Sequence, residues 1–439
     1  MAVRLVQAQA AGVQLSAKVV IVGNGIAGTT AALRVRQLAP EAEITMISEE
    51  TPLFYSRTAL MYVYMRQLQF ADTVVHPADF YRKQRIILKQ DLITSLDRQS
   101  RQLAGESGTY GYDYLLLAPG SRPRLPGLAG EDRAGVQGLY SKADLDRLEA
   151  QTRTPVSHAV IAGGGLIGVE LAEMLSSRRI PVTMLVREPL YFSHVLPQEE
   201  AHLVTNAVRQ HINLRLGTTL SEIRGDTAVR SVITSAGDEV PCALLGLTIG
   251  VEPRTELARS AGLAVRRGIV TDEFLRTADE RVYAAGDAAE LPLPGGESKV
   301  QQIWYTGRLQ GEVAGANLAA AISGKTPTAY DPGIYFNSAR FFTLDYQTYG
   351  QVPVTAGETN SLLWQNSAEG KLLRITYDPT KPGRPVTGFN ALGLRLLHPV
   401  CEAWIREKTS LESVVQNFDR AIFDPEFSKR YTKQLRNLL

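Results

Sequence analysis

Two stretches of the chain share one order of hydrophobic, glycine-rich and helix-forming positions. Residues 18–33 read KVVIVGNGIAGTTAAL, and residues 158–175 read HAVIAGGGLIGVELAEML. In each, an apolar run of strand length leads into a GxGxxG turn, and the residues after the turn suit the start of a helix. This order predicts a pyrophosphate held by backbone N–H groups at a helix N-terminus. Because the pattern occurs twice, the sequence predicts two bound dinucleotides.

The glycines of each turn have separate tasks. The first makes the turn, the second removes a Cβ from the path of the phosphate, and the third lets helix and strand pack closely. The cofactor-binding residues expected from the first turn are Gly23, Gly25, Ile26, Ala27 and Gly28, and those from the second are Gly163, Gly165, Leu166, Ile167 and Gly168.

An acidic residue follows the second predicted strand of the first unit. In EITMISEE, residues 43–50, Glu49 stands where a carboxylate accepts hydrogen bonds from ribose hydroxyls. When the second unit is laid on the first, Arg187 takes the place of Glu49. A guanidinium there suits a 2′-phosphate, so the second site favours NADPH over NADH. Glu188 follows directly and is the alternative ribose ligand, which leaves the coenzyme preference open.

Two later segments exceed what one nucleotide domain needs. They are YDYLLLAPGSRPRLPG, residues 112–127, and GIVTDEFLRTADERVYAAGDAAE, residues 268–290. With them the chain resembles the FAD-dependent pyridine-nucleotide reductases over residues 18–318. The resemblance implies that Asp287, after Gly286, hydrogen-bonds the flavin ribityl chain, and that the first segment is where the chain leaves the FAD domain. On the same basis, cofactor contacts are expected from Ala118, Gly120 and Gly250.

The segment EETPLFYSRTALMY, residues 49–62, narrows this resemblance. It is similar to a segment of ferredoxin and rubredoxin reductases and of the flavin portion of nitrite reductases, which implies that Arg57 lies by the FAD phosphates. A solvated loop arginine is the alternative. In that branch a lysine near the flavin pairs with the glutamate that Glu170 matches, but Tyr62 stands at the lysine position. Glu170 is a candidate for the nicotinamide pocket, or a helix-start glutamate stabilised by the macrodipole.

The helix expected over residues 304–318 resembles the family helix that caps the isoalloxazine. Gln310 and Gly311 occupy the matching positions. Quinone-reducing members carry an Ala-Gln pair where Trp304 and Tyr305 stand here, which disfavours quinone reduction.

The cysteines restrict the chemistry further. The chain has only two, Cys242 and Cys401, with no CxxC spacing and none in the segment after Glu49, where the disulfide reductases of this family keep their redox cysteine. Disulfide reduction through an internal dithiol is therefore excluded. Both cysteines are expected to be small buried residues.

Composition bounds the remaining possibilities. The 439 residues carry a net charge of +2 and are 44% hydrophobic, which predicts a globular chain of about three domains and no nucleic-acid partner. Apolar runs are of strand length, so no integral membrane segment is expected. The few cysteines and the absence of a signal-like N-terminus favour a cytoplasmic protein. The six histidines show no metal-ligand spacing.

The predicted fold class is α/β, with two doubly wound, Rossmann-like nucleotide domains, the second inserted in the first, and an α+β C-terminal domain. The predicted domains are 18–120 (FAD, first part), 121–278 (NAD(P)), 279–325 (FAD, second part) and 326–439 (C-terminal interface domain). In the last, residues 340–378 show strand patterns, residues 398–418 are predicted as one helix, and a homodimer is possible. The basic tail from Phe427 is interpreted either as a membrane-surface or acidic-partner docking helix or as a frayed end.

The function predicted from this pattern is hydride transfer from NAD(P)H to FAD, followed by electron delivery to an acceptor. The flavin carries the chemistry, so no side-chain acid, base or nucleophile is required. A small electron-carrier protein such as ferredoxin or rubredoxin is the first choice of acceptor. The alternatives are a non-turnover NAD(P)H-binding flavoprotein acting as scaffold, sensor or subunit of a larger redox complex, and a quinone reductase.

Overall fold

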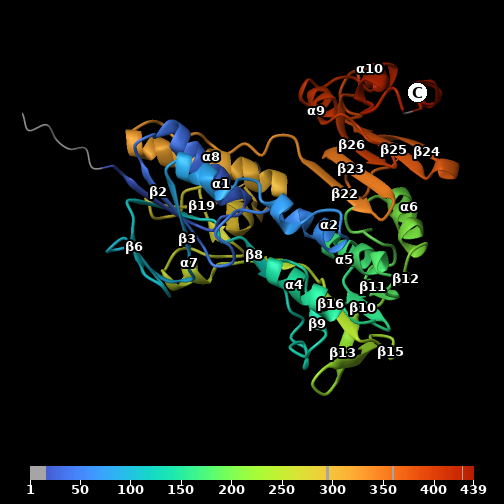
Figure 1. Ribbon diagram of the computed structural model, residues 1–439. Coiled ribbons are helices and arrows are strands. Elements are labelled where there is room, and N and C mark those ends of the chain that lie inside the picture. Colours follow the sequence, from blue (N-terminus) through green and yellow to red (C-terminus); the bar gives the residue numbers. More distant parts are fainter. Residues whose placement is uncertain (1–15, 293–295, 358–359, 428) are drawn as a thin grey trace, which may run out of the picture. The chain divides into compact units, whose positions relative to one another are not determined.

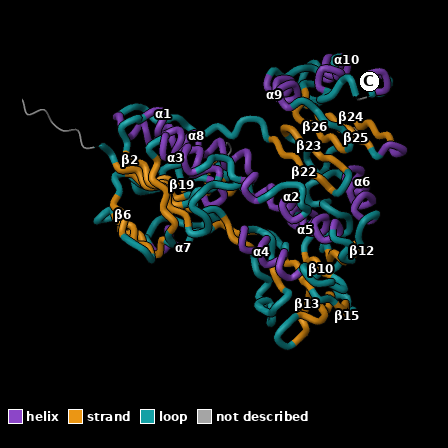
Figure 2. The backbone as a smooth tube through the Cα atoms, in the orientation of Figure 1, coloured by secondary structure: helices purple, strands orange, loops and turns teal. Residues whose placement is uncertain are grey.

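The computed structural model describes residues 16–292, 296–357, 360–427 and 429–439. Contacts among these residues divide the chain into two compact units (Figures 1 and 2). Unit 1 comprises residues 16–54, His76–Gly120 and Pro253–Tyr330. Unit 2 comprises Tyr55–Val75, Ser121–Glu252 and Asp331–Leu439.

Unit 1 is built on a five-stranded sheet in which all neighbours run parallel. From β1 the chain adds strands on one side and then crosses to the other side, so the strand order reverses beside β1. Ligands of such sheets bind at this reversal, outside the carboxyl ends of the strands. The strand order is β19 (Val282–Ala284), β7 (Tyr114–Leu117), β1 (Lys18–Val22), β2 (Glu43–Ser48) and β3 (Ile86–Gln90).

Two long helices of unit 1, α1 (Ile26–Leu38) and α8 (Trp304–Ser323), lie side by side (Figure 1). Glycines at every fourth position of α8 face α1. A Cβ built on Gly311 would lie 2.4 Å from the Ala27 carbonyl oxygen, and one on Gly315 would lie 2.6 Å from that of Ala31. The two helix backbones can approach this closely only because those positions carry no side chain.

Shorter elements complete unit 1. Their bounds are α3 (Ala78–Lys83), β4 (Ile93–Asp97), β5 (Gln102–Gly105), β6 (Thr109–Gly111), α7 (Glu256–Ser260), β18 (Ile269–Val270), η3 (Gly286–Ala288), β20 (Ala289–Pro292) and β21 (Ser298–Val300). The short 3-10 helix η2 (Phe70–Thr73) belongs to unit 2. Strands β4, β5 and β6 form an antiparallel meander, and Leu96 and Leu103 from it join the core beneath the parallel sheet.

Unit 2 contains a second five-stranded parallel sheet. Its order is β12 (Asn213–Arg215), β11 (Val182–Leu185), β10 (Ala159–Ala162), β16 (Leu244–Leu247) and β9 (Val136–Gln137). The helices of this part are α2 (Leu60–Tyr64), α4 (Lys142–Gln151), α5 (Leu166–Ser177) and α6 (Gln198–Arg209). This part also contains an antiparallel sheet of β13 (Leu220–Gly225), β14 (Val229–Thr234) and β15 (Glu239–Pro241). The short strands β8 (Ser121–Pro123) and β17 (Val251–Pro253) pair with each other, and η1 (Arg57–Ala59) is a single 3-10 turn.

The C-terminal part of unit 2 is an antiparallel sheet covered on both faces. Its order is β22 (Phe336–Phe341), β23 (Leu344–Gly350), β26 (Val386–Leu392), β25 (Lys371–Tyr377) and β24 (Ser361–Asn366). Register partners Tyr346, Leu392 and Leu372 join one core with α5 and α6, whereas Ile375 and Phe389 join another core. The second core is closed by α9 (His398–Arg406), α10 (Leu411–Gln416), η5 (Phe418–Ala421) and α11 (Thr432–Arg436). The sheet therefore shares its hydrophobic core with the helices of the second parallel sheet.

The predicted fold class is confirmed by the two parallel sheets with their helices and by the α+β C-terminal part. One local prediction is wrong: residues 398–418 form two helices and a short 3-10 turn, not one helix. The break lies at Lys408, whose φ is +53°, and Ser410 then caps α10 by accepting a hydrogen bond from the Ser413 N–H. A left-handed residue ends a helix, and a serine cap begins the next.

The basic tail packs against the C-terminal sheet. Tyr431 and Leu435 are buried, and the Trp364 indole N–H donates to the Gln434 side chain at 2.9 Å. Lys429 and Lys371 both bond the Glu369 carboxylate, which lowers its pKa to about 2. The described part of the tail is thus an ordered element of unit 2, and the interpretation as a frayed end is wrong.

Candidate dinucleotide sites

The first glycine turn joins β1 to α1 in unit 1. Gly23 has φ +103°, and a Cβ built on it would lie 2.0 Å from the Ala118 carbonyl oxygen. A Cβ on Gly28 would lie 2.0 Å from the Gly23 carbonyl oxygen. Gly23 is therefore required for backbone conformation, and Gly28 for close packing of the helix on the turn.

Gly25, the second glycine of this turn, has a different environment. Its φ is −65°, and no described heavy atom beyond its neighbours lies within 4 Å of a Cβ built there. Helix α1 begins directly after it, without a cap from any described side chain. The N–H groups of the first helical turn, including those of Ile26, Ala27 and Gly28, have no partner within the helix. Open space beside unpaired N–H groups at a helix N-terminus fits the pyrophosphate of a dinucleotide.

The second glycine turn, between β10 and α5 in unit 2, repeats this geometry. Gly163 has φ +117°, and its Cβ would lie 2.4 Å from the Thr248 carbonyl oxygen. The Cβ of an alanine at Gly168 would lie 2.3 Å from the Gly163 carbonyl oxygen, whereas that position at Gly165 is open. No described side chain caps α5, so Leu166, Ile167 and Gly168 offer the same kind of donor set. Both turns fit a dinucleotide by the same physical test.

The GD segment lies against the first glycine turn. Gly286 has φ +76°, and a Cβ on it would lie 3.0 Å from the Ala27 Cβ. Its N–H donates to the Gln310 side-chain oxygen of α8 at 2.7 Å. Asp287 follows in the same 3-10 turn. The packing of α8 on α1 thus brings Gly286, Asp287 and Gln310 to the N-terminus of α1, although all three are far from α1 in the sequence.

Glu49 follows β2 in unit 1 and is ion-paired. Its carboxylate bonds the guanidinium of Arg254. The backbone N–H of Arg254 donates to the Gly120 carbonyl at 3.0 Å. Ala118 and Gly120 occupy the turn after β7, and Gly120 has φ +75°. These residues meet at the carboxyl ends of β2 and β7, where the nucleotide of a doubly wound sheet binds.

Glu170 lies on α5, beyond the second glycine turn, and is half-buried. Burial and the neighbouring Glu173 carboxyl raise its pKa to about 7. Burial also raises the pKa of Glu173, and the charge of Arg340 works against that shift. One carboxyl oxygen of Glu173 is buried without a hydrogen-bond partner among the described residues. The helix therefore carries two carboxyl groups that resist ionisation.

Arg187 and Glu188 contact each other at the end of β11. The Arg187 guanidinium donates to the Glu188 carboxylate at 2.8 Å, and the Arg187 side chain is 80% exposed. Burial of Glu188 opposes ionisation, but the hydrogen bond and charge of Arg187 hold its pKa below the ordinary value. His194 stands 3.9 Å from the same carboxylate. The two residues expected to contact the adenosine ribose, Arg187 and Glu188, therefore lie together and form an ion pair with each other.

Arg57 belongs to unit 2. Its guanidinium donates to the Tyr55 hydroxyl at 2.8 Å and to the Tyr140 carbonyl at 3.2 Å, and it lies over both tyrosine rings. Tyr62 lies on α2, which packs against α5, the helix of Glu170. Gly250, with φ +111°, follows β16 in the same unit. The cofactor contacts expected of Arg57 and Gly250 stay predictions.

Neither cysteine is placed for redox chemistry. Cys242 and Cys401 are buried in different cores, and burial raises the pKa of Cys242 to about 12. The pKa of Cys401 is raised by burial as well. Thiols of this kind are poor nucleophiles because the reactive thiolate is disfavoured. Among the described residues, no group of three or more His, Cys, Asp or Glu side chains is arranged to hold a metal ion.

Three residues of these sites were not found from the sequence. Arg254 holds Glu49, Thr248 donates to the Gly163 carbonyl at 3.1 Å, and Tyr191 donates to the Gly165 carbonyl at 3.2 Å. A glycine motif specifies the turn but says nothing of the side chains that support it. Thr248 and Arg254 both lie in the segment TIGVEPRTEL, residues 248–257, which also contains the expected cofactor contact Gly250.

Comparison with known proteins gives consistent matches. The sequence pattern of the family described as "Pyridine nucleotide-disulphide oxidoreductase" matches residues 17–311. The chain is 31% identical over 317 residues to the biphenyl dioxygenase system ferredoxin–NAD(+) reductase component of Paraburkholderia xenovorans, covering 72% of this chain and 77% of that protein. It is 32% identical over 323 residues to the NAD(P)H coenzyme A polysulfide/persulfide reductase of Pyrococcus horikoshii, covering 70% and 71%.

The fold is shared with solved structures. A ferredoxin reductase from Rhodopseudomonas palustris superposes with a TM-score of 0.78 at 24% identity, over 96% of this chain and 99% of that one. In the part of the chain that is described, no helix combines the length and apolar character needed to cross a membrane. Given two glycine turns of dinucleotide-binding geometry and a family match over more than half of its length, the chain belongs to the pyridine nucleotide-disulphide oxidoreductase family and is an FAD-dependent NAD(P)H reductase.

Proposed function

We propose that this reductase passes the electrons of NAD(P)H to a small electron-carrier protein of the ferredoxin or rubredoxin type. The proposal rests on one combination of features: the chain has two complete glycine turns, and both of its cysteines are buried. The protein can hold two dinucleotides, but neither thiol is placed to relay electrons. The ferredoxin reductase relative supports a carrier as acceptor.

In this proposal FAD is bound by residues 18–120 and 279–325 and NAD(P)H by residues 121–278. Bound FAD accepts a hydride and can release its two electrons singly. One NAD(P)H therefore reduces two one-electron carriers, forming NAD(P)+ and one proton. The first glycine turn, Glu49 and Asp287 hold the FAD, and the second glycine turn holds the NAD(P)H pyrophosphate.

NADPH is the proposed coenzyme because Arg187 stands where the first unit has Glu49. Bringing a 2′-phosphate to Arg187 would replace its contact with Glu188 by a charge-assisted contact to the phosphate. Arg187→Glu should then lower kcat/KM for NADPH by about tenfold or more and leave NADH less affected. An unchanged NADPH to NADH ratio in the variant assigns the ribose to Glu188 instead.

Sulfur reduction is the second candidate because the Pyrococcus relative is named a polysulfide/persulfide reductase. The two buried thiols argue against it in this chain. The variant Cys242→Ala, Cys401→Ala should keep its flavin-normalised rate of carrier reduction, and native protein should react with a thiol reagent only after unfolding. Persulfide reduction that disappears in this variant would overturn the carrier assignment.

Steady-state reduction of a panel of ferredoxins and rubredoxins by NADPH, beside ferricyanide, a soluble quinone and an organic persulfide, tests the proposal directly. A carrier reduced with the highest kcat/KM supports it. Faster quinone turnover would favour a quinone reductase, despite Trp304 and Tyr305 at the start of α8. Flavin that is reduced by NADPH but reoxidised slowly by every acceptor would favour the non-turnover role. A cytoplasmic location and a homodimer stay predictions.

A further inference from the structure

Tyr191 is a buried tyrosine that contacts the second glycine turn. It lies in the loop between β11 and α6 and is 0% exposed. Its hydroxyl donates to the Gly165 carbonyl at 3.2 Å. Its ring also lies beside Gly164, where a built Cβ would be 3.4 Å from the Tyr191 Cε2. The side chain thus contacts the turn through both its hydroxyl and its ring.

The Gly165 carbonyl does not need this hydrogen bond for helix formation. It already accepts the Val169 N–H at 3.2 Å, the first hydrogen bond of α5. The hydroxyl of Tyr191 is a second donor to the same oxygen. The Gly165 carbonyl and the Leu166 N–H belong to the same planar peptide group and point in opposite directions. A hydrogen bond that fixes the carbonyl therefore also fixes the direction of this N–H. Leu166 is the first residue of α5, and its N–H is among those available to a phosphate.

Tyr191 is itself fixed by α6 and by the C-terminal sheet. Its backbone N–H donates to the Thr205 hydroxyl at 2.9 Å, and that hydroxyl donates to the Ala201 carbonyl at 2.7 Å. The edge of the Phe341 ring meets the Tyr191 ring with centroids 5.9 Å apart and planes at 83°. Phe341 is the last residue of β22, so the contact joins the C-terminal sheet to the glycine turn.

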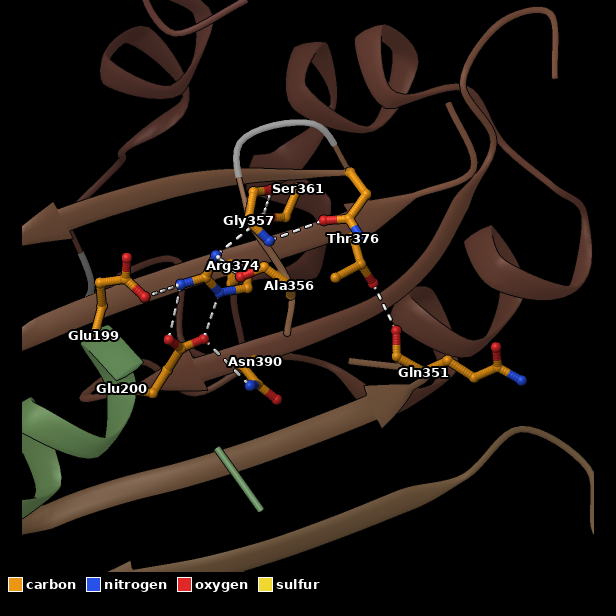
Figure 3. Close-up of polar contacts among 10 residues, drawn as sticks. Glu199, Glu200, Gln351, Ala356, Gly357, Ser361, Arg374, Thr376 and Asn390 are labelled. Atoms are coloured by element: carbon orange, nitrogen blue, oxygen red, sulfur yellow. Dashed lines mark hydrogen bonds and ion pairs between the residues drawn. The ribbon is translucent and has the colours of Figure 1, made fainter. Parts of the chain in front are cut away.

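The C-terminal sheet also fixes the first turn of α6. Arg374 on β25 donates to both oxygens of Glu200, at 2.7 and 3.0 Å, and to Glu199 at 2.7 Å (Figure 3). Asn390, its register partner on β26, donates to Glu200 at 3.3 Å. Arg374 is 2% exposed and Glu200 0%. A buried, fully bonded ion pair of this kind holds two elements in one geometry, because separating the charges is costly.

We propose that Tyr191 is a positioning residue for NAD(P)H, through which α6 and the C-terminal sheet hold the second glycine turn in its binding conformation. The inference rests on the proposed function, since it takes the second turn as the NAD(P)H site. A phenylalanine would fill the same space. The hydroxyl therefore acts on the turn and is not required for packing.

The test compares two tyrosine-to-phenylalanine variants. Tyr191→Phe removes the bond to Gly165. Tyr349→Phe is the matched control, because Tyr349 is also 0% exposed and its hydroxyl also donates to a backbone carbonyl at 3.2 Å, that of Leu396 in the C-terminal part. Binding of NADP+ to the FAD-loaded, oxidised protein is measured by calorimetry, and kcat and KM for NADPH are measured with ferricyanide.

Tyr191→Phe should raise the dissociation constant of NADP+ and the KM for NADPH about three- to tenfold, the effect of losing one neutral hydrogen bond. The kcat and the FAD content should stay close to those of the wild type, because binding is weakened equally in ground and transition states. Tyr349→Phe should change thermal stability to a similar degree and leave both binding values unchanged. Equal binding in the two variants would overturn the inference.

A second pair of variants covers the case in which Tyr191→Phe does not fold. Thr205→Val removes the acceptor of the Tyr191 N–H, and Thr205→Ser retains it. Weaker NADP+ binding in the valine variant with recovery in the serine variant supports the positioning role, and equal binding in both contradicts it. If the wild type neither binds NADP+ or NAD+ nor is reduced by NAD(P)H, the proposed function itself has failed, independently of Tyr191.

Discussion

The carboxylate of Glu49 pairs with the guanidinium of Arg254, which stands 205 residues further along the chain. Both side chains are about one-third exposed, so the pair itself contributes little stability, about 0–1 kcal/mol. Its effect is on orientation of the carboxylate that we expect at the FAD ribose. Glu49→Gln should raise the dissociation constant of FAD about tenfold or more, whereas Arg254→Met should raise it less than about fivefold.

Fluorescence titration of the apoprotein with FAD measures both changes. Arg122→Met is the control, because Arg122 forms a comparable exposed pair with Glu252 at 2.8 Å in unit 2. Wild-type affinity in Glu49→Gln would remove Glu49 from the FAD site.

Gly25 and Gly28 should respond differently to alanine. A Cβ at Gly25 meets no described atom, and its backbone conformation is open to alanine, so Gly25→Ala should fold but retain little FAD. Gly28→Ala would place a Cβ 2.0 Å from the Gly23 carbonyl oxygen and should fail to fold. Circular dichroism and the flavin absorbance of the purified protein separate the two outcomes. Gly165→Ala is the parallel variant in the second turn, and it should stay yellow while losing NADPH-dependent reduction.

The raised pKa of Glu170 should make the free energy of unfolding depend on pH. This pKa of about 7 lies above the ordinary glutamate value of about 4.5, so the folded protein retains a proton that the unfolded chain releases between these pH values. Stability is therefore lost as the pH rises from about 4.5 to 7 and is constant above that range. Glu170→Gln removes this loss and should stabilise the protein by about 3 kcal/mol at pH 8 and by very little at pH 4.

Urea unfolding of both proteins at the two pH values measures the difference. Glu106→Gln, in an exposed turn, is the control and should show no such pH dependence. A gain in Glu170→Gln that is the same at pH 4 and pH 8 would contradict the burial of this carboxyl group.

The tail should matter for stability and, separately, for carrier binding. Stopping the chain after Pro425 removes the buried Tyr431 and Leu435. This should lower the melting temperature by several degrees, since the burial of each large side chain contributes about 1.5–3 kcal/mol. Arg430→Glu combined with Lys433→Glu changes two exposed side chains and leaves that packing intact. This variant should reduce an acidic carrier more slowly at low salt only.

Ferricyanide reduction by the same charge-reversal variant should match the wild type, because a small acceptor needs no docking surface. Carrier rates that are independent of both salt and these charges would assign the tail to packing alone.

The glycine turns were predictable because their requirements are local. Gly23 and Gly163 need a left-handed backbone, Gly28 and Gly168 need close packing, and each requirement appears directly as a residue type at a fixed spacing. The side chains that support the turns were not predictable in this way. In the sequence, nothing distinguishes Tyr191 from other aromatic residues in loops; its contact with Gly165 exists only in the folded protein. Arg254 likewise gains its partner only when β2 and the segment after β16 meet.

The C-terminal region shows the limit of hydrophobic patterning. Strand patterns over residues 340–378 correspond to β23, β24, β25 and only the end of β22. The strand β26 was not predicted because GFNAL carries glycine and asparagine, which are unfavourable in strands. Asn390 is tolerated there because it donates to the buried Glu200. A polar residue that completes a network across two parts of the chain cannot be distinguished from a loop residue without its partner.

The shared core of unit 2 determines how this enzyme can be recombined with its relatives. Tyr346, Leu372 and Leu392 lie in one hydrophobic core with residues of α5 and α6. Among the described residues, the acidic partners of Arg374 are Glu199 and Glu200 on α6. A chimaera that took the coenzyme half from one parent and the C-terminal sheet from another would mismatch an apolar surface and leave a buried guanidinium uncompensated. The helices of the second parallel sheet and the C-terminal sheet must therefore be exchanged together, as one structural module.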